Sequence, residues 1–550
     1  MMNPLDFTWI FGVGMVVAFI DAYGIGANDV ANSFASSISS GSLSLIQAVI
    51  IACFTEFLGA LLLGSGVTKT IKSGIIDIDL FAETPEMLMM GMMCALIGSS
   101  TWVLTATRFG WPVSTTHSII GAICGFGIAG FGGSAVDWTW DGIIQIVVSW
   151  FLSPALAGII AAIIYTITKY AVLRQVDSIK WGLRLVPVYF FFTITIAVFY
   201  ICFKAPGASG VLPIEHIIAI AFGSGGAIGI YMAVFLCPWL KRVVVDREDV
   251  KWYHIPIIWW VPKQRTIEEG LEAARRELEE AQANHQIPKA DDEEKVAGEP
   301  ISEKLASVEG HSEPSSTAVN DESKSIQKPP KTFRERAFEI KERVLAVLLH
   351  GIRQDVRNLS NDKLSKMHQA AEMYDDDVEF MFSYLQILTA IVASFAHGSN
   401  DVSNAVGPLA TIFDIWQKGT VGGESPVPVW VLVYGGIAID VGLATMGYRL
   451  MRALGNNITR LTPSRGFSVE LGAALTVLTA SQLELPVSST HCIVGATVGV
   501  GLCNGSLRAI NWKMLGYTFL GWVCTLPVAG LISGLIYAFC AYGPSFVYLR

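Results

Sequence analysis

Two short polar stretches with the same pattern lie in otherwise apolar sequence. The first is Gly26-Ala-Asn-Asp-Val-Ala-Asn32, and the second, 372 positions later, is Gly398-Ser-Asn-Asp-Val-Ser-Asn404. Ionisable groups are rare inside membrane helices and mark functional sites there. We predict that both stretches interrupt their helices and form two halves of one site. The residues expected to contribute are Asn28, Asp29, Asn32, Asn400, Asp401 and Asn404.

Two hydroxyl-rich stretches form a second pair, Pro112-Val-Ser-Thr-Thr-His117 and Pro486-Val-Ser-Ser-Thr-His491. Proline suits the first turn of a helix, and a helix N-terminus offers free N–H donors that bind anions. The mirrored pair therefore predicts a site for a tetrahedral oxyanion such as phosphate. Plain N-capping by Ser and Thr is the alternative. The hydroxyls concerned are those of Ser114, Thr115, Thr116, Ser488, Ser489 and Thr490.

Asp29 and Asp401 repel an anion unless their charge is neutralised. A bound Na⁺ achieves this, because a hard cation prefers carboxylate, carboxamide and backbone oxygens, which a broken helix supplies. Protonation of the two carboxylates is the alternative. Glu56 and Glu470 are two further carboxylates in apolar sequence. Each is expected to be a proton site, an ion ligand or half of a buried pair.

An enzyme is a weaker hypothesis. His117 and His491 are too few for a metal site, and no orienting acid accompanies Ser114 and His117 as a nucleophile pair. We therefore expect no enzymatic activity and no resident cofactor, only co-transported Na⁺ or H⁺. A channel or a phosphate-sensing receptor is the other class to test.

The composition indicates an integral membrane protein. Of the 550 residues, 52% are hydrophobic and 15% are charged, against about 25% charged in an average soluble protein. Residues 241–378 hold 50 of the 85 charged residues. The net charge of −9 favours no nucleic-acid partner. The partners expected are a tetrahedral oxyanion such as phosphate, a cation such as sodium and the lipid bilayer, and a homodimer is one arrangement to test.

An all-α fold with 10–12 transmembrane segments is predicted from apolar runs of about 20 residues. Two further apolar runs, 112–131 and 486–503, begin at the hydroxyl-rich stretches and are predicted to be the return arms of re-entrant hairpins. The predicted spans are 7–25, 43–64, 86–107, 142–167, 184–204, 214–239, 380–397, 427–450, 468–484 and 514–541.

The polar stretch and the hydroxyl-rich stretch recur in the same order, at offsets of 372–374 residues. Trp150, Pro154 and Gly158 extend the match to Trp522, Pro527 and Gly530. If 86–131 is a hairpin, five spans separate the two copies, and an odd number inverts the second copy. The sequence therefore predicts the inverted-topology repeat typical of secondary transporters.

Three domain segments follow: membrane domain 1–240, a cytoplasmic loop 241–378, and membrane domain 379–550. Lys and Arg are concentrated in the loops 168–184, 241–251 and 449–465, which places these loops inside and both termini outside. Lys69 and Lys72 do not fit this orientation. Within the loop, helices are expected at 266–286 and 333–370, with a disordered segment between them.

These motifs together resemble the inorganic phosphate transporter (PiT) family. The resemblance rests on Gly26–Asn32, His397–Asn404, the two hydroxyl-rich stretches and Ser149–Pro154, and it covers about 1–240 and 380–550. Gly26–Ser40 is especially similar to fungal high-affinity sodium/phosphate symporters. Ser399 departs from the Ala of many members.

The resemblance implies uptake of inorganic phosphate coupled to Na⁺, or to H⁺, by alternating access at the plasma membrane. By motif match it assigns Asp29, Asn32, Asp401 and Asn404 to the ion and phosphate sites, and it gives Glu56 and Glu470 roles in transport.

Overall fold

The computed structural model describes residues 4–64, 67–68, 70–71, 74–204, 212–266, 268–269, 272, 362–422, 427–483 and 485–543. This part of the chain is almost entirely helical. Nine of its helical segments are long and apolar enough to cross a membrane. The chain is thus an all-helical, multi-pass membrane protein. The main helices are α1 (Thr8–Ile25), α2 (Ala31–Ser39), α3 (Leu45–Leu63), α5 (Pro85–Arg108), α6 (Thr115–Phe131), α7 (Gln145–Thr168), α8 (Ser178–Lys204), α9 (Ile214–Tyr231), α10 (Cys237–Leu240), α13 (Asp362–Gln369), α14 (Asp376–Lys418), α15 (Val429–Met446), α16 (Tyr448–Leu454), α17 (Pro463–Gln482), α18 (Ser489–Leu502) and α19 (Trp512–Tyr542).

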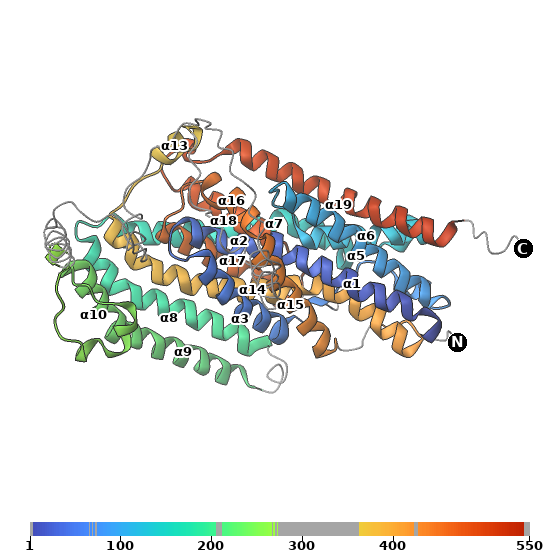
Figure 1. The fold of residues 1–550 in the computed structure, drawn as a ribbon, viewed down its shortest axis with the longest axis horizontal. Coiled ribbons are helices and arrows are strands. Elements are labelled where there is room, and N and C mark those ends of the chain that lie inside the picture. Colours follow the sequence, from blue (N-terminus) through green and yellow to red (C-terminus); the bar gives the residue numbers. More distant parts are fainter. Residues whose placement is uncertain are drawn as a thin grey trace, which may run out of the picture.

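The molecule has two ends along its long axis. The start of α1 and the end of α19 lie at one end, here called the terminal side (Figure 1). α10 and α13, which flank the long polar insert, lie at the other end, the insert side. Exposed tryptophans lie on both sides, as expected at the two membrane interfaces. They include Trp9, Trp138 and Trp140 on the terminal side and Trp259 and Trp260 on the insert side.

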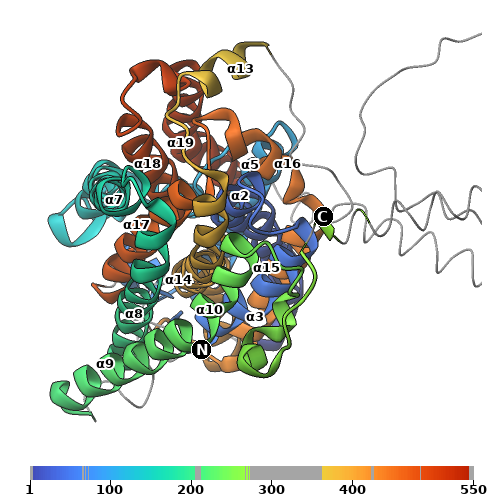
Figure 2. The same ribbon diagram turned by 90° about the vertical axis from the view of Figure 1, so that its left-hand side faces the viewer.

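α14 is the central helix (Figure 2). It packs against α1, α3, α5, α8, α15 and α17. Its 43 residues span about 65 Å at 1.5 Å per residue, twice the thickness of a hydrocarbon core. The predicted span 380–397 is therefore only part of this helix. Because almost its whole middle is buried by protein, α14 needs no lipid-facing apolar surface and tolerates many polar side chains.

The two polar stretches do not break their helices as predicted. Gly26–Val30 forms one π-helical turn between α1 and α2, so that Thr8–Ser39 is one helical rod. The second stretch lies within uninterrupted α14. Tertiary partners for the Asn and Asp side chains explain this result, because such residues loosen a helix when they bond to their own backbone instead.

Two helix pairs carry the hydroxyl-rich stretches. α5 and α6 enter from the terminal side, whereas α17 and α18 enter from the insert side, and the turn of each pair lies deep in the molecule (Figure 1). α6 begins at Thr115 and α18 at Ser489, three residues after the prolines predicted to open them. Pro112 and Pro486 instead lie in the turns, where proline restricts the chain without costing a helical hydrogen bond.

The packing repeats at the sequence offsets of the motifs. A Cβ at Gly121 of α6 would meet the carbonyl oxygen of Leu526 at 2.4 Å. A Cβ at Gly495 of α18, 374 positions later, would meet that of Pro154 at 2.2 Å, 372 positions before Leu526. Glycine allows the backbones to approach this closely. The pair α6–α19 is thus packed in the same way as α18–α7.

A second equivalent pair of contacts supports the polar stretches. A Cβ at Gly26 would lie 1.8 Å from the carbonyl oxygen of Ile439, and one at Gly398 would lie 2.2 Å from that of Glu56. The first glycine of each stretch is therefore fixed by backbone contact with α15 or α3. No other residue fits without moving a helix.

The segment after the predicted boundary at residue 240 begins as helix. Helical structure continues to Val245, and the following segment folds back on it. Arg242 pairs with Glu248 at 2.5 Å and donates to the carbonyl oxygens of Val261 and Pro262. Of the helices predicted within the insert, most lies outside the described residues. The described part of 333–370 is helix α13.

Candidate functional site

The two polar stretches and the two helix-pair turns meet at the centre of the molecule. All of the predicted site residues are brought into this region or directly beside it, and each is at most 5% exposed. Of the predicted site residues, Ser489 is the most exposed. The site is therefore closed to solvent in this conformation.

Asp29 is held by both turns. Its carboxylate accepts hydrogen bonds from the hydroxyl and the backbone N–H of Thr115, the latter at 3.2 Å, and from the hydroxyl of Thr490. Thr115 opens α6 and Thr490 lies in the first turn of α18. One carboxylate thus joins the two helix N-termini, whose partial positive charge favours it.

Asp401 occupies the equivalent position on α14. Its carboxylate accepts from the Ser489 hydroxyl at 2.6 Å, from the Thr116 hydroxyl at 3.1 Å and from the Asn404 amide at 3.3 Å. The two aspartates therefore take up most of the hydroxyl donors predicted to bind an anion. In this conformation, carboxylate and anion would compete for the same donors.

The carboxamides of the site differ in how their nitrogen and oxygen atoms are bonded. The Nδ2 of Asn32 donates to Thr490 at 2.7 Å, and that of Asn404 donates to Thr115 and Thr116 at 3.2 and 3.1 Å. The Oδ1 atoms of Asn32, Asn400 and Asn404 have no hydrogen-bond partner among the described residues. Buried carbonyl oxygens are rarely left without a partner, so these three atoms are candidates for cation ligands.

Asn28 is fully occupied by the first turn. Its Nδ2 donates to the Thr107 hydroxyl at 2.9 Å and to the carbonyl of Trp111 at 3.1 Å, and its Oδ1 accepts from the N–H of Val113 at 3.2 Å. This side chain therefore connects the π-helical turn to the α5–α6 turn. Its geometry is that of a positioning residue.

Ser114 and Ser488 are helix caps. The Oγ of each accepts from the N–H three residues later, His117 and His491, at 3.2 Å. N-capping, the alternative considered for each whole hydroxyl-rich stretch, thus applies only to the first serine of the stretch. The next two hydroxyls in each stretch are directed to the aspartates instead.

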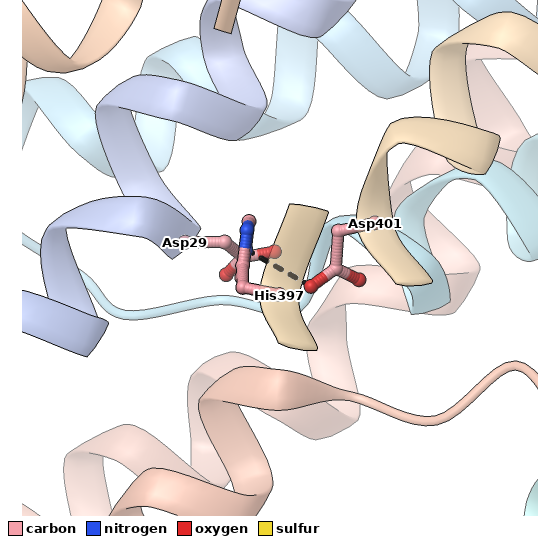
Figure 3. Close-up of side chains that lie close together, drawn as sticks. All are labelled: Asp29, His397 and Asp401. Carbon is pink, nitrogen blue, oxygen red and sulfur yellow. Dashed lines mark ion pairs between the residues drawn. The ribbon is translucent and has the colours of Figure 1, made fainter. Parts of the chain in front are cut away.

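His397 is a central residue to which the sequence reasoning assigned no role. Its Nδ1 lies 2.7 Å from Glu56 and its Nε2 lies 2.9 Å from Asp401. Figure 3 shows Asp29, His397 and Asp401 close together, with the His397–Asp401 ion pair dashed. Potential ligand atoms of these three residues lie within 4.8 Å of one another. The spacing of His397 and Asp401, four residues apart on one helix, was the available signal.

The imidazole of His397 therefore connects the Glu56 carboxylate to that of Asp401. It also accepts from the Ser394 hydroxyl at 2.7 Å. Three buried carboxylates with one histidine leave an excess of negative charge. A buried charge must be paired, bound to an ion or neutralised by a proton, so either cations or protons offset this charge.

Glu470 lies further toward the insert side. It accepts from Ser36, Ser37 and Thr389 at 2.6–2.7 Å and from Gln386 at 3.1 Å. Its side chain is fully buried. It fixes α2, the helix that carries the end of the first polar stretch, to α14 and α17.

Two cavities lead from the site toward the insert side. A small one of about 20 Å³ is bordered by Asn32, Ser36, Leu454 and Ile458. A larger one of about 520 Å³ includes Ser39, Ser40 and the segment 460–463. Leu461 borders both cavities. The two cavities are therefore neighbours, with Leu461 between them.

This fold and this buried polar centre are those of a multi-pass helical membrane transporter. The chain belongs to the phosphate transporter family, whose family model matches residues 25–533. The resemblance predicted from the motifs is thus confirmed, as is the expectation of a transporter and not an enzyme.

The alignments with named relatives cover almost the whole chain. It is 38% identical to the phosphate-repressible phosphate permease pho-4 of Neurospora crassa, over 99% of both chains. It is 31% identical to sodium-dependent phosphate transporter 2 of Homo sapiens, over 98% of this chain and 99% of the relative. A solved structure described as the sodium-dependent phosphate transporter matches with a TM-score of 0.67 and 27% identity, covering 97% of this chain and 100% of that one.

Proposed function

We propose that this protein is a symporter that imports inorganic phosphate together with sodium by alternating access. One observation carries the proposal: Asp29 and Asp401 lie at the meeting point of the two turns, beside three carboxamide oxygens without partners. Family membership and the names of the relatives agree with it.

Sodium binds between the two aspartates. Hard cations take oxygen ligands from carboxylates and carboxamides, and the carboxylates of Asp29 and Asp401 with the Oδ1 atoms of Asn32, Asn400 and Asn404 offer such a set. Asn28 orients the first turn, and Glu56 acts through His397. Glu470 holds α2, which lines the route to the insert side.

Phosphate binds to the hydroxyls that the aspartates occupy here. Thr115, Thr116, Ser489 and Thr490 each donate to a carboxylate. A cation on the carboxylates competes with these donors, which are then free to turn to phosphate. Ser114 and Ser488 keep the helix N-termini in place, so their N–H groups add anion affinity. Cation binding and anion binding thereby become one coupled event.

The architecture we propose is an inverted-topology repeat with α5–α6 and α17–α18 as re-entrant hairpins. The equivalent contacts of Gly121 with Leu526 and of Gly495 with Pro154 support it, as does the entry of the two hairpins from opposite ends. Each hairpin turn then faces one membrane side, and each serves as the wall of one gate.

The insert side is the cytoplasmic side in this proposal, and both termini are outside the cell, at the plasma membrane. Basic residues in the loops of the insert side support this orientation. The two cavities on this side then mark the route by which phosphate leaves, and separation of Leu454 and Ile458 opens it.

Proton coupling is the second candidate. The chain of contacts from Glu56 through His397 to Asp401 favours it, because an imidazole between two carboxylates can pass a proton. In this case protonation, not sodium, would neutralise the aspartates.

The test is uptake of radiolabelled phosphate into proteoliposomes, with sodium and proton gradients imposed separately. We expect accumulation driven by inward sodium and little by protons alone. Accumulation that follows only the proton gradient would select the second candidate. Equilibration without accumulation under either gradient would contradict both and indicate a channel.

A further inference from the structure

A wide groove of about 1,350 Å³ lies on the insert side, between the α5–α6 turn and the membrane surface. Among the described residues, no long helix fills the space beyond this turn. The start of α19 and the segment around Asn457 form two of its walls, and α13 from the insert lies across it, next to Leu507–Ala509.

The walls of the groove are apolar toward the hairpin and basic toward the surface. The apolar part includes Trp102, Phe109, Trp111 and Leu520. The basic part is formed by Lys366 of α13, Arg508 and Lys513. Among the described residues that line the groove, none is acidic, and none of the three basic side chains forms an ion pair with a described carboxylate.

One wall of the groove lies on an exposed face of α19. Tyr517 and Leu520 of α19 line it and are 59% and 58% exposed, on the outer face of a predicted membrane span. Trp512, which also lines it, marks the interface level. The phosphate route through Asn32 and Leu454 has different walls. The groove is therefore distinct from that route.

We propose that this groove binds one anionic phospholipid of the insert-side leaflet. Its phosphate and headgroup lie against Lys366, Arg508 and Lys513, and an acyl chain follows the aromatic wall toward the hairpin turn. Basic pockets between membrane helices on the cytoplasmic side recognise anionic headgroups in this way. Lys513 is held in position, with its ammonium 5.6 Å from the ring centre of Tyr517.

The bound lipid also contacts the machinery of the site. Trp111 and Pro112 form the inner wall of the groove, and their carbonyl oxygens accept hydrogen bonds from Asn28 and Trp522. An acyl chain against this turn restricts its movement. Occupancy of the groove therefore regulates the hairpin without touching the ions themselves.

Native mass spectrometry of the purified full chain tests the proposal, with phosphatidylserine and phosphatidylcholine as probes. We expect one tightly bound phosphatidylserine and a clear preference over phosphatidylcholine. The variant Lys366→Gln/Arg508→Gln/Lys513→Gln should bind it about 100-fold more weakly, at roughly fivefold per basic residue. Cys524→Trp, which fills the apolar end of the groove, should weaken both lipids.

The matched control is Lys180→Gln/Arg184→Gln/Lys241→Gln, which removes the same charge from exposed residues near the insert side, outside the groove. It should bind phosphatidylserine like the wild type. Equal losses in the two triple variants would overturn the proposal, as would unchanged binding in both groove variants. The assay does not involve phosphate transport, so its result is independent of the proposed function.

Discussion

At the scale of single residues, Asp29 and Asp401 carry the coupling. Asp29→Asn and Asp401→Asn keep the size of the side chain and remove its charge. We expect each to lower sodium-driven phosphate uptake at least about 100-fold while the protein still folds, because a neutral amide cannot hold the cation. Uptake into proteoliposomes is the measurement. Asp79→Asn, at an exposed position, is the control and should transport normally.

His397 determines the response to protons. In His397→Gln the chain from Glu56 to Asp401 is cut, and the imidazole between the two carboxylates is gone. We expect the pH dependence of uptake to weaken, while dependence on sodium remains. A variant that keeps the wild-type pH profile would show that protons act elsewhere.

Much of this site was predictable from the sequence, because duplication marks it. Asp29, Asp401 and the hydroxyls of both turns were identified from two motifs, and the structure brings them together. The link between Glu56 and His397 joins residues 341 positions apart. Such a contact depends on how α3 packs on α14, which no local pattern shows.

At the scale of helices, glycine contacts set the positions of the polar stretches. Gly398→Ala would place a methyl group 2.2 Å from the carbonyl oxygen of Glu56. We expect it to destabilise the protein by about 1–3 kcal/mol, because backbone cannot yield as a side chain can. Thermal unfolding in detergent measures this. Gly226→Ala, where the added carbon meets nothing within 4 Å, should be near neutral.

The continuity of α14 was the main feature of the helices that the sequence did not predict. Asn, Asp, Ser and a proline at Pro408 all lower helix propensity. Tertiary packing outweighs this preference here, since Asn400, Asp401 and Asn404 bond to the two turns, and only the serines of this stretch bond to their own helix backbone. A prediction from propensity alone therefore ends the helix too early.

Glu372, in the turn between α13 and α14, pairs with Lys169 and Arg174 at 2.7 Å. Burial raises the pKa of this carboxyl, but hydrogen bonds from the two basic residues outweigh that effect and lower the pKa to about 2. The pKa in the folded state lies below the unfolded value, which is near 4.5. This carboxylate therefore contributes its full stabilisation to the folded protein at pH values above about 4.5. The stabilisation is lost as the pH falls toward 2.

We therefore expect Glu372→Gln to reduce the free energy of unfolding by about 1–2 kcal/mol at pH 7. The difference from wild type should shrink below about pH 4. Thermal unfolding at pH 7 and pH 3 measures both. Asp249→Asn, in an exposed pair with Lys251, should change stability at neither pH.

At the scale of the whole molecule, the orientation in the membrane determines the direction of transport. In a Cys540→Ser background, Gly133→Cys should react with a membrane-impermeant maleimide on intact cells. Lys263→Cys should react only after permeabilisation. Both positions are exposed and lie on the terminal and insert sides. The reverse pattern would show that the insert side faces outward.

The central claim is that sodium on the two aspartates frees the hydroxyls of both turns for phosphate. Its most direct test is the binding of phosphate to the purified protein, in sodium and in an equal concentration of N-methylglucamine. By linkage, each ligand must strengthen the other. We predict phosphate binding at least about tenfold tighter in sodium, and loss of this difference in Asp29→Asn and Asp401→Asn. Equal affinity in the two media, for the wild-type protein, would contradict the account.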